Sequence, residues 1–279
     1  MSLHNSNRLM TLVAGVSAVF ASSAAVHAAP TYFTGTTNTA KSSTTLGTGA
    51  TQAQGVHDAF LADVSTHGTV QTFTFESYAA AKTNVTTTGV ASPDFNLTFS
   101  GSGKGRVDSV NATPSKGAQT VGFNTTAGGS KSLYIVQGNG QPEALNFTFT
   151  KPVSAFGFYV TGLGNTKVGA AYPSTLTASF TDGSGAQSIV LHGSKQGGAE
   201  FFGFTDYGQS ISSLTFTEAA LTKTIDQFSI DDIITVEPFP VVIPPAAVPE
   251  PGQIATLMLG AFGLFVAGFR KSRRQSLSN

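Results

Sequence analysis

The sequence contains no cysteine and no tryptophan, and it has few charged residues. Without cysteine the chain forms no disulfides and offers neither a thiol nucleophile nor a cysteine-ligated metal site. Charged residues make up 11% of the chain, whereas about 25% is typical of soluble domains. A domain without disulfides depends on its hydrophobic core for stability, and this chain is long enough to build one.

The few basic residues gather toward the two ends of the chain. The formal net charge is zero, but Arg8 and a basic C-terminal cluster leave the body between Ala29 and Val248 mildly acidic. A mildly acidic body with scattered Lys and Arg has no electrostatic footprint for nucleic acid. Low charge with abundant Thr, Ser, Gly and Phe favours a β-rich exported protein over a cytosolic enzyme.

The N-terminal residues 1–28 have the three-part layout of a secretory signal peptide. Arg8 precedes an apolar stretch that runs from Leu9 to about Ala25, and Val26-His27-Ala28 places small residues at the −3 and −1 positions. We expect signal peptidase to cleave after Ala28. The alternative is an uncleaved membrane anchor.

Alternation of apolar and polar residues with a period of two begins near Val70. A sheet with one buried and one solvent-facing surface requires this pattern. In residues 71–76 the pattern places Phe73 and Phe75 on one face. The other alternating segments are 95–100, 145–150, 176–181 and 212–217, and further strand candidates lie at 119–123, 132–137, 155–161, 187–192, 200–205 and 227–236. Turn sequences such as Gly138-Asn139-Gly140 separate them. This spacing predicts an all-β fold, an antiparallel, jelly-roll-like β-sandwich.

The predicted sandwich domain covers residues 56–236. It opens on one short helix, since Val56, Phe60, Leu61 and Val64 share the spacing of a helical face. Residues 29–55 before it are rich in Thr, Ser and Gly and predict a low-complexity, flexible arm or loosely held edge. Residues 237–248 after it predict a stiff, proline-rich spacer.

The C-terminal end combines three features in order. Pro249, Glu250 and Pro251 precede an uncharged apolar run at 254–269, which predicts a short membrane helix. The basic residues Arg270, Lys271, Arg273 and Arg274 follow and predict a cytoplasmic C-terminus by the positive-inside rule. The signal peptide places the body on the other side of the membrane, so the N-terminal and C-terminal signals predict the same orientation.

This ordered triplet, residues 249–275, resembles the PEP-CTERM sorting signal. The resemblance implies that Pro249, Glu250 and Pro251 are the recognition motif for an exosortase, a membrane-embedded cysteine protease-transpeptidase of Gram-negative bacteria. It also implies that the inner membrane holds the precursor transiently before the body is released. The family's pattern often has Ser or Thr after the second proline, whereas this chain has Gly252-Gln253. Such proteins occur in bacteria that make exopolysaccharide and biofilm.

The body carries a second resemblance. Segments such as "KPVSAFGFYVTG" and "FSIDDIIT" are similar to blocks of exported β-sandwich domains, and the closing "IDDI" is similar to the last strand of calcium-stabilised jelly rolls related to carbohydrate-binding modules. The resemblance implies a structural Ca²⁺ held by Glu76 with Asp231 or Asp232, and hard oxygen ligands suit Ca²⁺. Alternatively, Asp231 and Asp232 simply alternate at a strand end.

No catalytic motif is recognisable in the sequence, so we expect that the chain is not an enzyme. His57, His67 and His192 remain after signal cleavage, and His192, which lies beside a turn, is expected to be a satisfied surface residue. Glu200 and Asp206 lie six positions apart, which places them on one strand face but too far apart for a catalytic pair. We expect these acids to keep a strand end soluble.

Two functions fit these observations. The first is an exported, non-enzymatic protein of the cell surface or extracellular matrix, with a structural or adhesive role in exopolysaccharide. The alternative is a carbohydrate-binding module acting on matrix polysaccharide and stabilised by calcium. Because sugar-stacking platforms favour Trp and Tyr, the absence of Trp weighs against the alternative.

Overall fold

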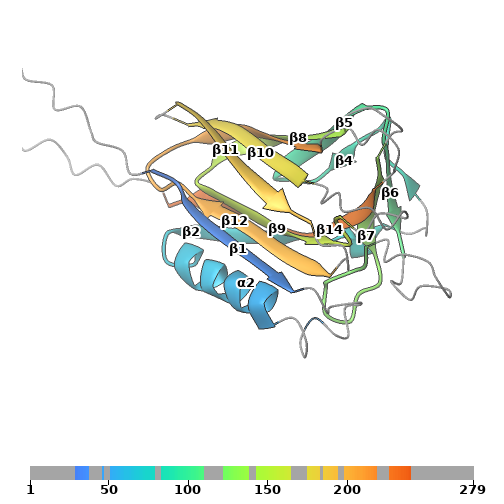
Figure 1. Ribbon diagram of the computed structural model, residues 1–279. Coiled ribbons are helices and arrows are strands. Elements are labelled where there is room, and N and C mark those ends of the chain that lie inside the picture. The colour runs from blue at the N-terminus through green and yellow to red at the C-terminus, as the bar shows by residue number, and fades with distance from the viewer. Residues whose placement is uncertain are drawn as a thin grey trace, which may run out of the picture. The chain divides into compact units, whose positions relative to one another are not determined.

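A computed structural model describes residues 29–37, 46, 51–78, 83–109, 122–137, 143–164, 175–182, 185–193, 198–218 and 226–239 (Figure 1). The elements in chain order are β1 (Thr31–Thr37), α2 (Thr51–Val64), β2 (Gly68–Phe73), η1 (Phe75–Ser77), β3 (Thr83–Asn84), β4 (Val90–Ala91), β5 (Phe95–Gly101), β6 (Lys104–Asp108), β7 (Ser132–Val136), β8 (Glu143–Val153), β9 (Ala155–Thr161), β10 (Thr175–Asp182), β11 (Gly185–His192), β12 (Ala199–Thr205), β13 (Ile211–Glu218) and β14 (Gln227–Pro238). Within these ranges no helix is both long and apolar enough to cross a membrane.

The strands form two antiparallel sheets stacked as a β-sandwich, which confirms the all-β expectation. The larger sheet has the order β1-β12-β9-β14-β7-β6-β3, and β2 also pairs with β14. The smaller sheet has the order β11-β10-β13-β8-β5-β4. Strand β14 is central because it pairs with β9 along one edge and with β7 and then β2 along the other.

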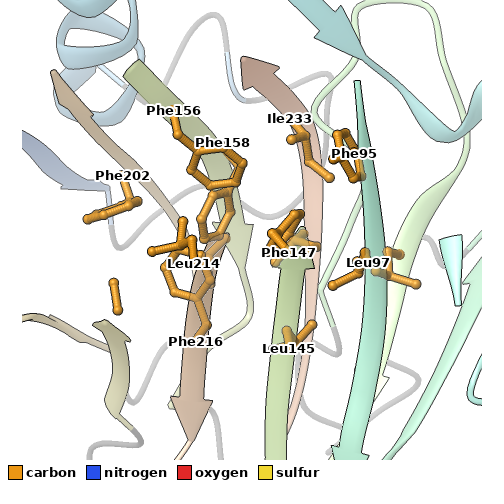
Figure 2. Close-up of a cluster of buried hydrophobic side chains, with 14 of the residues drawn as sticks. Phe95, Leu97, Leu145, Phe147, Phe156, Phe158, Phe202, Leu214, Phe216 and Ile233 are labelled. Atoms are coloured by element: carbon orange, nitrogen blue, oxygen red, sulfur yellow. The ribbon is translucent and has the colours of Figure 1, made fainter. Parts of the chain in front are cut away.

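Phenylalanine fills the space between the two sheets (Figure 2). In β8 the side chains of Leu145 and Phe147 are buried, whereas Thr148 is exposed, as the period of two predicts. The ring of Phe216 from the smaller sheet lies 4.7 Å from that of Phe158 in the larger sheet, at an interplanar angle of 88°. Edge-to-face contacts of this kind add stability beyond area burial, about 0.5–1.5 kcal/mol per pair.

Helix α2 covers the outer face of the larger sheet (Figure 1). Phe60 is fully buried there, and its ring lies 5.4 Å from that of Phe201. A Cβ added to Gly203 in β12 would lie 2.9 Å from the Phe60 ring, so glycine lets the helix approach closely. All residues of β9 and β12 are therefore buried, so neither strand has a solvent-facing side.

Within residues 29–55 the structure describes an edge strand, as the second of the two alternatives predicted, and the beginning of α2. Residues Thr31–Thr37 form an edge strand paired with β12 along its whole length, and α2 begins at Thr51, five residues before Val56. An edge strand is held by backbone hydrogen bonds and needs few large apolar side chains. Phe33 supplies one such side chain, since its ring lies 5.4 Å from that of Phe60.

The strand predicted over residues 71–76 ends at Phe73. The chain then turns through the 3₁₀ helix η1, so the buried ring of Phe75 comes from a turn and not from the strand. Of the strand predicted at 119–123, the described residues Gly122 and Phe123 lie in a loop. No alternation of large apolar residues marks β3, β4 or β6 in the sequence, and β3 and β4 have only two residues each.

Candidate functional site

Asp231 and Asp232 lie at a β-bulge in the middle of β14. The pairing of β14 with β9 shifts register between Asp231 and Ile234, and on the other edge the partner changes from β7 at Ile230 to β2 at Ile233. Asp232 has a φ of 47°, in the left-handed region. A bulge inserts one extra residue and re-aims side chains, so two consecutive carboxylates face the same loop.

The loop that they face contains Thr125 and Thr126. Oδ2 of Asp231 accepts a hydrogen bond from the backbone N–H of Thr125 at 2.8 Å. The Thr125 hydroxyl donates to Oδ2 of Asp232 at 2.7 Å, and the Thr126 hydroxyl donates to Oδ1 of Asp232 at 2.6 Å. The two aspartates therefore fasten this loop to the central strand of the larger sheet.

Glu76 fastens the other end of the same loop. Its Oε1 accepts hydrogen bonds from the backbone N–H groups of Ser130 and Lys131, each at 2.7 Å. Asn124 links the two ends, because its amide donates to Glu76 at 3.4 Å while its Oδ1 accepts from the Thr126 N–H at 2.6 Å. We call Glu76, Asn124, Thr125, Thr126, Asp231 and Asp232 the acid clasp.

Asp231 is the most deeply buried acid of the clasp. It has no exposed surface, and its Oδ1 has no hydrogen-bond partner among the described residues. Burial, and then the neighbouring charge of Asp232, raise the pKa of Asp231 above its ordinary value. A buried carboxylate oxygen without a hydrogen bond costs free energy. A cation bound at Oδ1 of Asp231 would remove this cost.

The clasp fits the predicted calcium site only in part. Asp231 and Asp232 bring hard oxygen donors together, as Ca²⁺ requires. Glu76, however, uses its Oε1 on the far end of the loop. Within the described ranges, no group of three or more His, Cys, Asp or Glu side chains is arranged to hold a metal ion. The predicted residues thus meet on one loop without forming a three-carboxylate cluster, and calcium stays a prediction.

Two of the three histidines, His57 and His67, pack against aromatic rings. His57 stacks on Tyr159 with ring centroids 5.2 Å apart and contacts Asp58 at 3.0 Å. His67 stacks on Tyr207 at 3.8 Å, just after the end of α2. His192 is exposed at the end of β11.

Glu200 and Asp206 differ from their predicted role as soluble strand-end charges. Glu200 lies in β12 and Asp206 directly follows it, but the two residues are only 7% and 3% exposed. Burial raises the pKa of Glu200 to about 7. Burial, and then contact with the Asp182 carboxyl, raise the pKa of Asp206 to about 6. Glu200 also lines an open cavity of about 420 Å³ between β1 and α2.

Several predicted features lie outside the described residues. These are the signal peptide 1–28, the sorting motif Pro249, Glu250 and Pro251, the membrane helix 254–269 and the basic residues Arg270, Lys271, Arg273 and Arg274. Of the spacer 237–248, the structure describes only the first three residues, two of which extend β14.

Sequence reasoning missed Asn124, Thr125 and Thr126, the loop half of the clasp. The one signal available was a short polar run between Gly122 and Gly128, two glycines that adopt positive φ values of 84° and 72°. Nothing in the sequence connects this run to β14, because more than a hundred residues separate them.

No family model and no curated protein matches the chain. Among solved structures, the family 11 carbohydrate-binding module of the cellulosomal cellulase Lic26A-Cel5E of Clostridium thermocellum is similar, with 9% identity and a TM-score of 0.31 over 57% of this chain and 96% of that one. The structure of TmCBM61 in complex with β-1,4-galactotriose has 17% identity and a TM-score of 0.31, over 54% and 92% of the two chains.

A third similar structure is the enzymatically active domain of tailspike protein 4 of bacteriophage CBA120. The identity is 15% and the TM-score 0.32, and the match covers 52% of this chain but only 19% of the tailspike chain. With TM-scores this low, none of these matches indicates what the chain binds.

Proposed function

We propose that this chain is an exported, non-enzymatic β-sandwich of the cell surface or extracellular matrix, with a structural or adhesive role in exopolysaccharide. Its precursor enters the inner membrane of a Gram-negative bacterium with the C-terminus in the cytoplasm. An exosortase then cleaves near Pro249-Glu250-Pro251 and releases the body. We also propose that the strands follow a jelly-roll-like order.

The acid clasp is the observation that carries the non-enzymatic part of this proposal. Its carboxylates accept hydrogen bonds from backbone N–H groups and threonine hydroxyls of a single loop. A general acid or base must instead be free to reach a proton on a substrate. The acids of the clasp are thus occupied in holding the fold together.

The termini support the proposed route. Residues 1–28 have the pattern of a signal peptide, and residues 249–275 contain a motif, an apolar run and a basic cluster. The two sets of signals predict the same orientation of the chain in the membrane. The absence of cysteine suits a protein whose stability rests on a phenylalanine core and on backbone pairing.

Mass spectrometry of the mature protein tests the sorting. In wild-type cells we expect a form that begins near Ala29 and ends near Pro251. In the Glu250→Ala variant, or in cells that lack the exosortase, we expect the C-terminal residues to be retained. Retention of residues beyond Pro251 in wild-type cells would rule out processing and leave a single-pass anchor.

The alternative, a calcium-stabilised carbohydrate-binding module, is favoured by one observation, the adjacent carboxylates of Asp231 and Asp232. A cation that binds only the folded state raises its stability, by about 2.7 kcal/mol at a concentration of 100 Kd. We expect Ca²⁺ to raise the Tm of the wild-type chain and not that of Asp231→Asn. An unchanged wild-type Tm at millimolar Ca²⁺ would exclude the metal.

A further inference from the structure

Among the described residues, the outward side chains of the smaller sheet are mostly hydroxyls and amides. Ala186, Val190 and His192 of β11 share this face, since they pair with Thr181, Thr177 and Thr175. Side chains along each strand alternate between buried apolar residues and exposed or half-exposed polar ones. The outward hydroxyl and amide residues are Asn96, Thr98 and Ser100 of β5, Asn146, Thr148 and Thr150 of β8, Ser213, Thr215 and Thr217 of β13, Thr175, Thr177, Ser179 and Thr181 of β10, and Ser188 of β11. We call these side chains the hydroxyl face.

The strand registers arrange the hydroxyl face as a regular array. One row runs across five strands, because Thr98 is opposite Asn146, Asn146 opposite Thr215, Thr215 opposite Ser179, and Ser179 opposite Ser188. Neighbouring strands in a sheet lie about 4.8 Å apart, and outward residues on one strand recur about every 6.8 Å. The polar groups therefore repeat in two dimensions.

Part of this array is fixed by its own hydrogen bonds. The Thr215 hydroxyl donates to Oδ1 of Asn146, and the Asn146 amide donates to the Ser100 hydroxyl, each at 3.1 Å. Short side chains of this kind also lose little rotamer entropy when a partner binds. The face is thus largely ordered before any contact is made.

The lack of charge on this face is selective. The acids in these strands, Glu143, Asp182 and Glu218, are at most 8% exposed. The exposed Lys151 of β8 forms an ion pair with Glu237 of β14, a strand of the larger sheet. Val190 on β11 is the one large apolar side chain of this sheet, within the described ranges, that is strongly exposed.

These properties decide the kind of partner. An uncharged face has no attraction for a polyanion or for nucleic acid, and a face without an apolar patch has no driving force for ordinary protein docking. A neutral polysaccharide presents hydroxyls that both donate and accept, as Thr and Ser hydroxyls do. Desolvating neutral hydroxyls also costs less than desolvating charges.

We propose that the hydroxyl face is an adhesive surface for extended, uncharged polysaccharide chains. Figure 1 shows the smaller sheet on the side of the larger sheet opposite α2, so the helix does not cover this face. Many weak hydrogen bonds, repeated at the spacing of the strands, take the place of aromatic stacking. This inference rests on the proposed matrix role and names the surface and the ligand class that would perform it.

The test is a binding assay with insoluble neutral polysaccharides. The full chain, purified in mild detergent, is mixed with the polysaccharide, and the protein lost from solution is measured. Cellulose and insoluble β-1,3-glucan are the probes, and calcium alginate beads are the anionic comparison. The variants replace exposed threonines of the face, Thr98→Lys with Thr148→Lys, and the same pair with Glu. The matched control is Thr72→Lys, an exposed threonine of the larger sheet. The Tm of each variant shows that it is folded.

We expect the wild type to bind a neutral polysaccharide, both double variants to bind roughly tenfold more weakly, and Thr72→Lys to bind as the wild type does. Equal weakening by Lys and Glu would show that the polar array matters and not the sign of the charge. No binding of the wild type to neutral polysaccharide, binding to alginate alone, or full binding by the double variants would each overturn the inference.

The same variants separate this inference from the proposed function. If the wild type reaches the matrix in cells while the purified chain ignores neutral polysaccharide, the hydroxyl face is wrong and the matrix role stands. If the precursor is never exported, the matrix role fails whatever the purified chain binds. Self-association that is lost in the double variants would assign the face to a second copy and would also overturn the inference.

Discussion

Among the described residues, Asp232 is the one non-glycine residue with a positive φ, at 47°. A conformation of this kind costs about 1–3 kcal/mol and persists only where the surroundings stabilise it. The hydrogen bonds from the Thr125 and Thr126 hydroxyls provide that stabilisation, at 2.7 and 2.6 Å. At the residue scale, side-chain hydrogen bonds in the clasp therefore offset the backbone strain of Asp232.

Substitutions at Asp232 can separate these two contributions. Asn tolerates the left-handed region and keeps hydrogen-bonding capacity, Gly relieves the strain but removes the bonds, and Ala does neither. We expect the free energy of unfolding to fall in the order Asp232→Asn, Asp232→Gly, Asp232→Ala, with a loss of about 1–3 kcal/mol for Ala. Urea denaturation in EDTA measures it, and equal values for Ala and Asn would contradict the assignment.

Glu200 makes stability depend on pH. Burial raises its pKa from 4.5 to about 7, so between these values the folded state holds a proton that the unfolded state has released. The contribution of Glu200 to stability is therefore fully present below about pH 4.5 and is lost as the pH rises toward 7.

We expect Glu200→Gln to remove this part of the pH dependence while keeping the size of the side chain. Its Tm should change less than that of the wild type between pH 5 and pH 8, and it should match or exceed the wild type at pH 8. Asp58→Asn, at an exposed position on α2, is the control. Parallel pH profiles for wild type and Glu200→Gln would show that Glu200 does not titrate in this range.

At the scale of elements, the docking of α2 decides which strands have a solvent-facing side. Phe60 packs over Gly203, where an added Cβ would lie 2.9 Å from its ring. The helix thereby buries the outer faces of β9 and β12, while the smaller sheet keeps an exposed polar face. The contact of Phe60 with Gly203 is one part of the apolar cluster that joins α2 to the larger sheet.

A double-mutant cycle tests the contact between α2 and β12. Phe60→Ala should destabilise the protein by about 3–5 kcal/mol through loss of a fully buried ring. Gly203→Ala should destabilise the wild type but cost at least about 0.5 kcal/mol less in the Phe60→Ala background, because part of the clash is gone. Additive effects in chemical denaturation would show that the two positions do not interact.

At the scale of the whole molecule, the chain divides after Pro238. Residues Met1–Pro238 form one compact unit and Phe239–Asn279 another. The first unit contains both sheets, α2 and the clasp, and it ends with the last residue of β14. Its stability should therefore not depend on the residues that follow.

We expect a chain that ends at residue 238 to unfold with the same Tm as the longer chain and in one cooperative transition. Truncation to residue 230 should prevent folding, because it removes the half of β14 that pairs with β2 and carries the clasp aspartates. Differential scanning calorimetry of the 29–238 chain is the measurement. A Tm lowered by more than a few degrees would show that the C-terminal residues stabilise the sandwich.

The sequence predicted the alternating strands well and the acid clasp only in part. Phe147 and Thr148 reveal the two faces of β8 because their alternation is local. Glu76, Asp231 and Asp232 came from a resemblance, and the structure brings them to one loop. The loop residues were missed because the contacts span up to 107 positions of sequence.

By itself, the sequence determined which residues face the core in most strands, since a period of two requires no knowledge of partners. It also determined the expectation of export, since the terminal signals are read along the chain. Only the tertiary structure decided which strands are buried on both faces and where β14 has its bulge. It also decided that the acids of the clasp contact the loop at residues 124–126. The physical reason is that these features depend on what packs against a residue, and the order of residues along the chain does not contain that information.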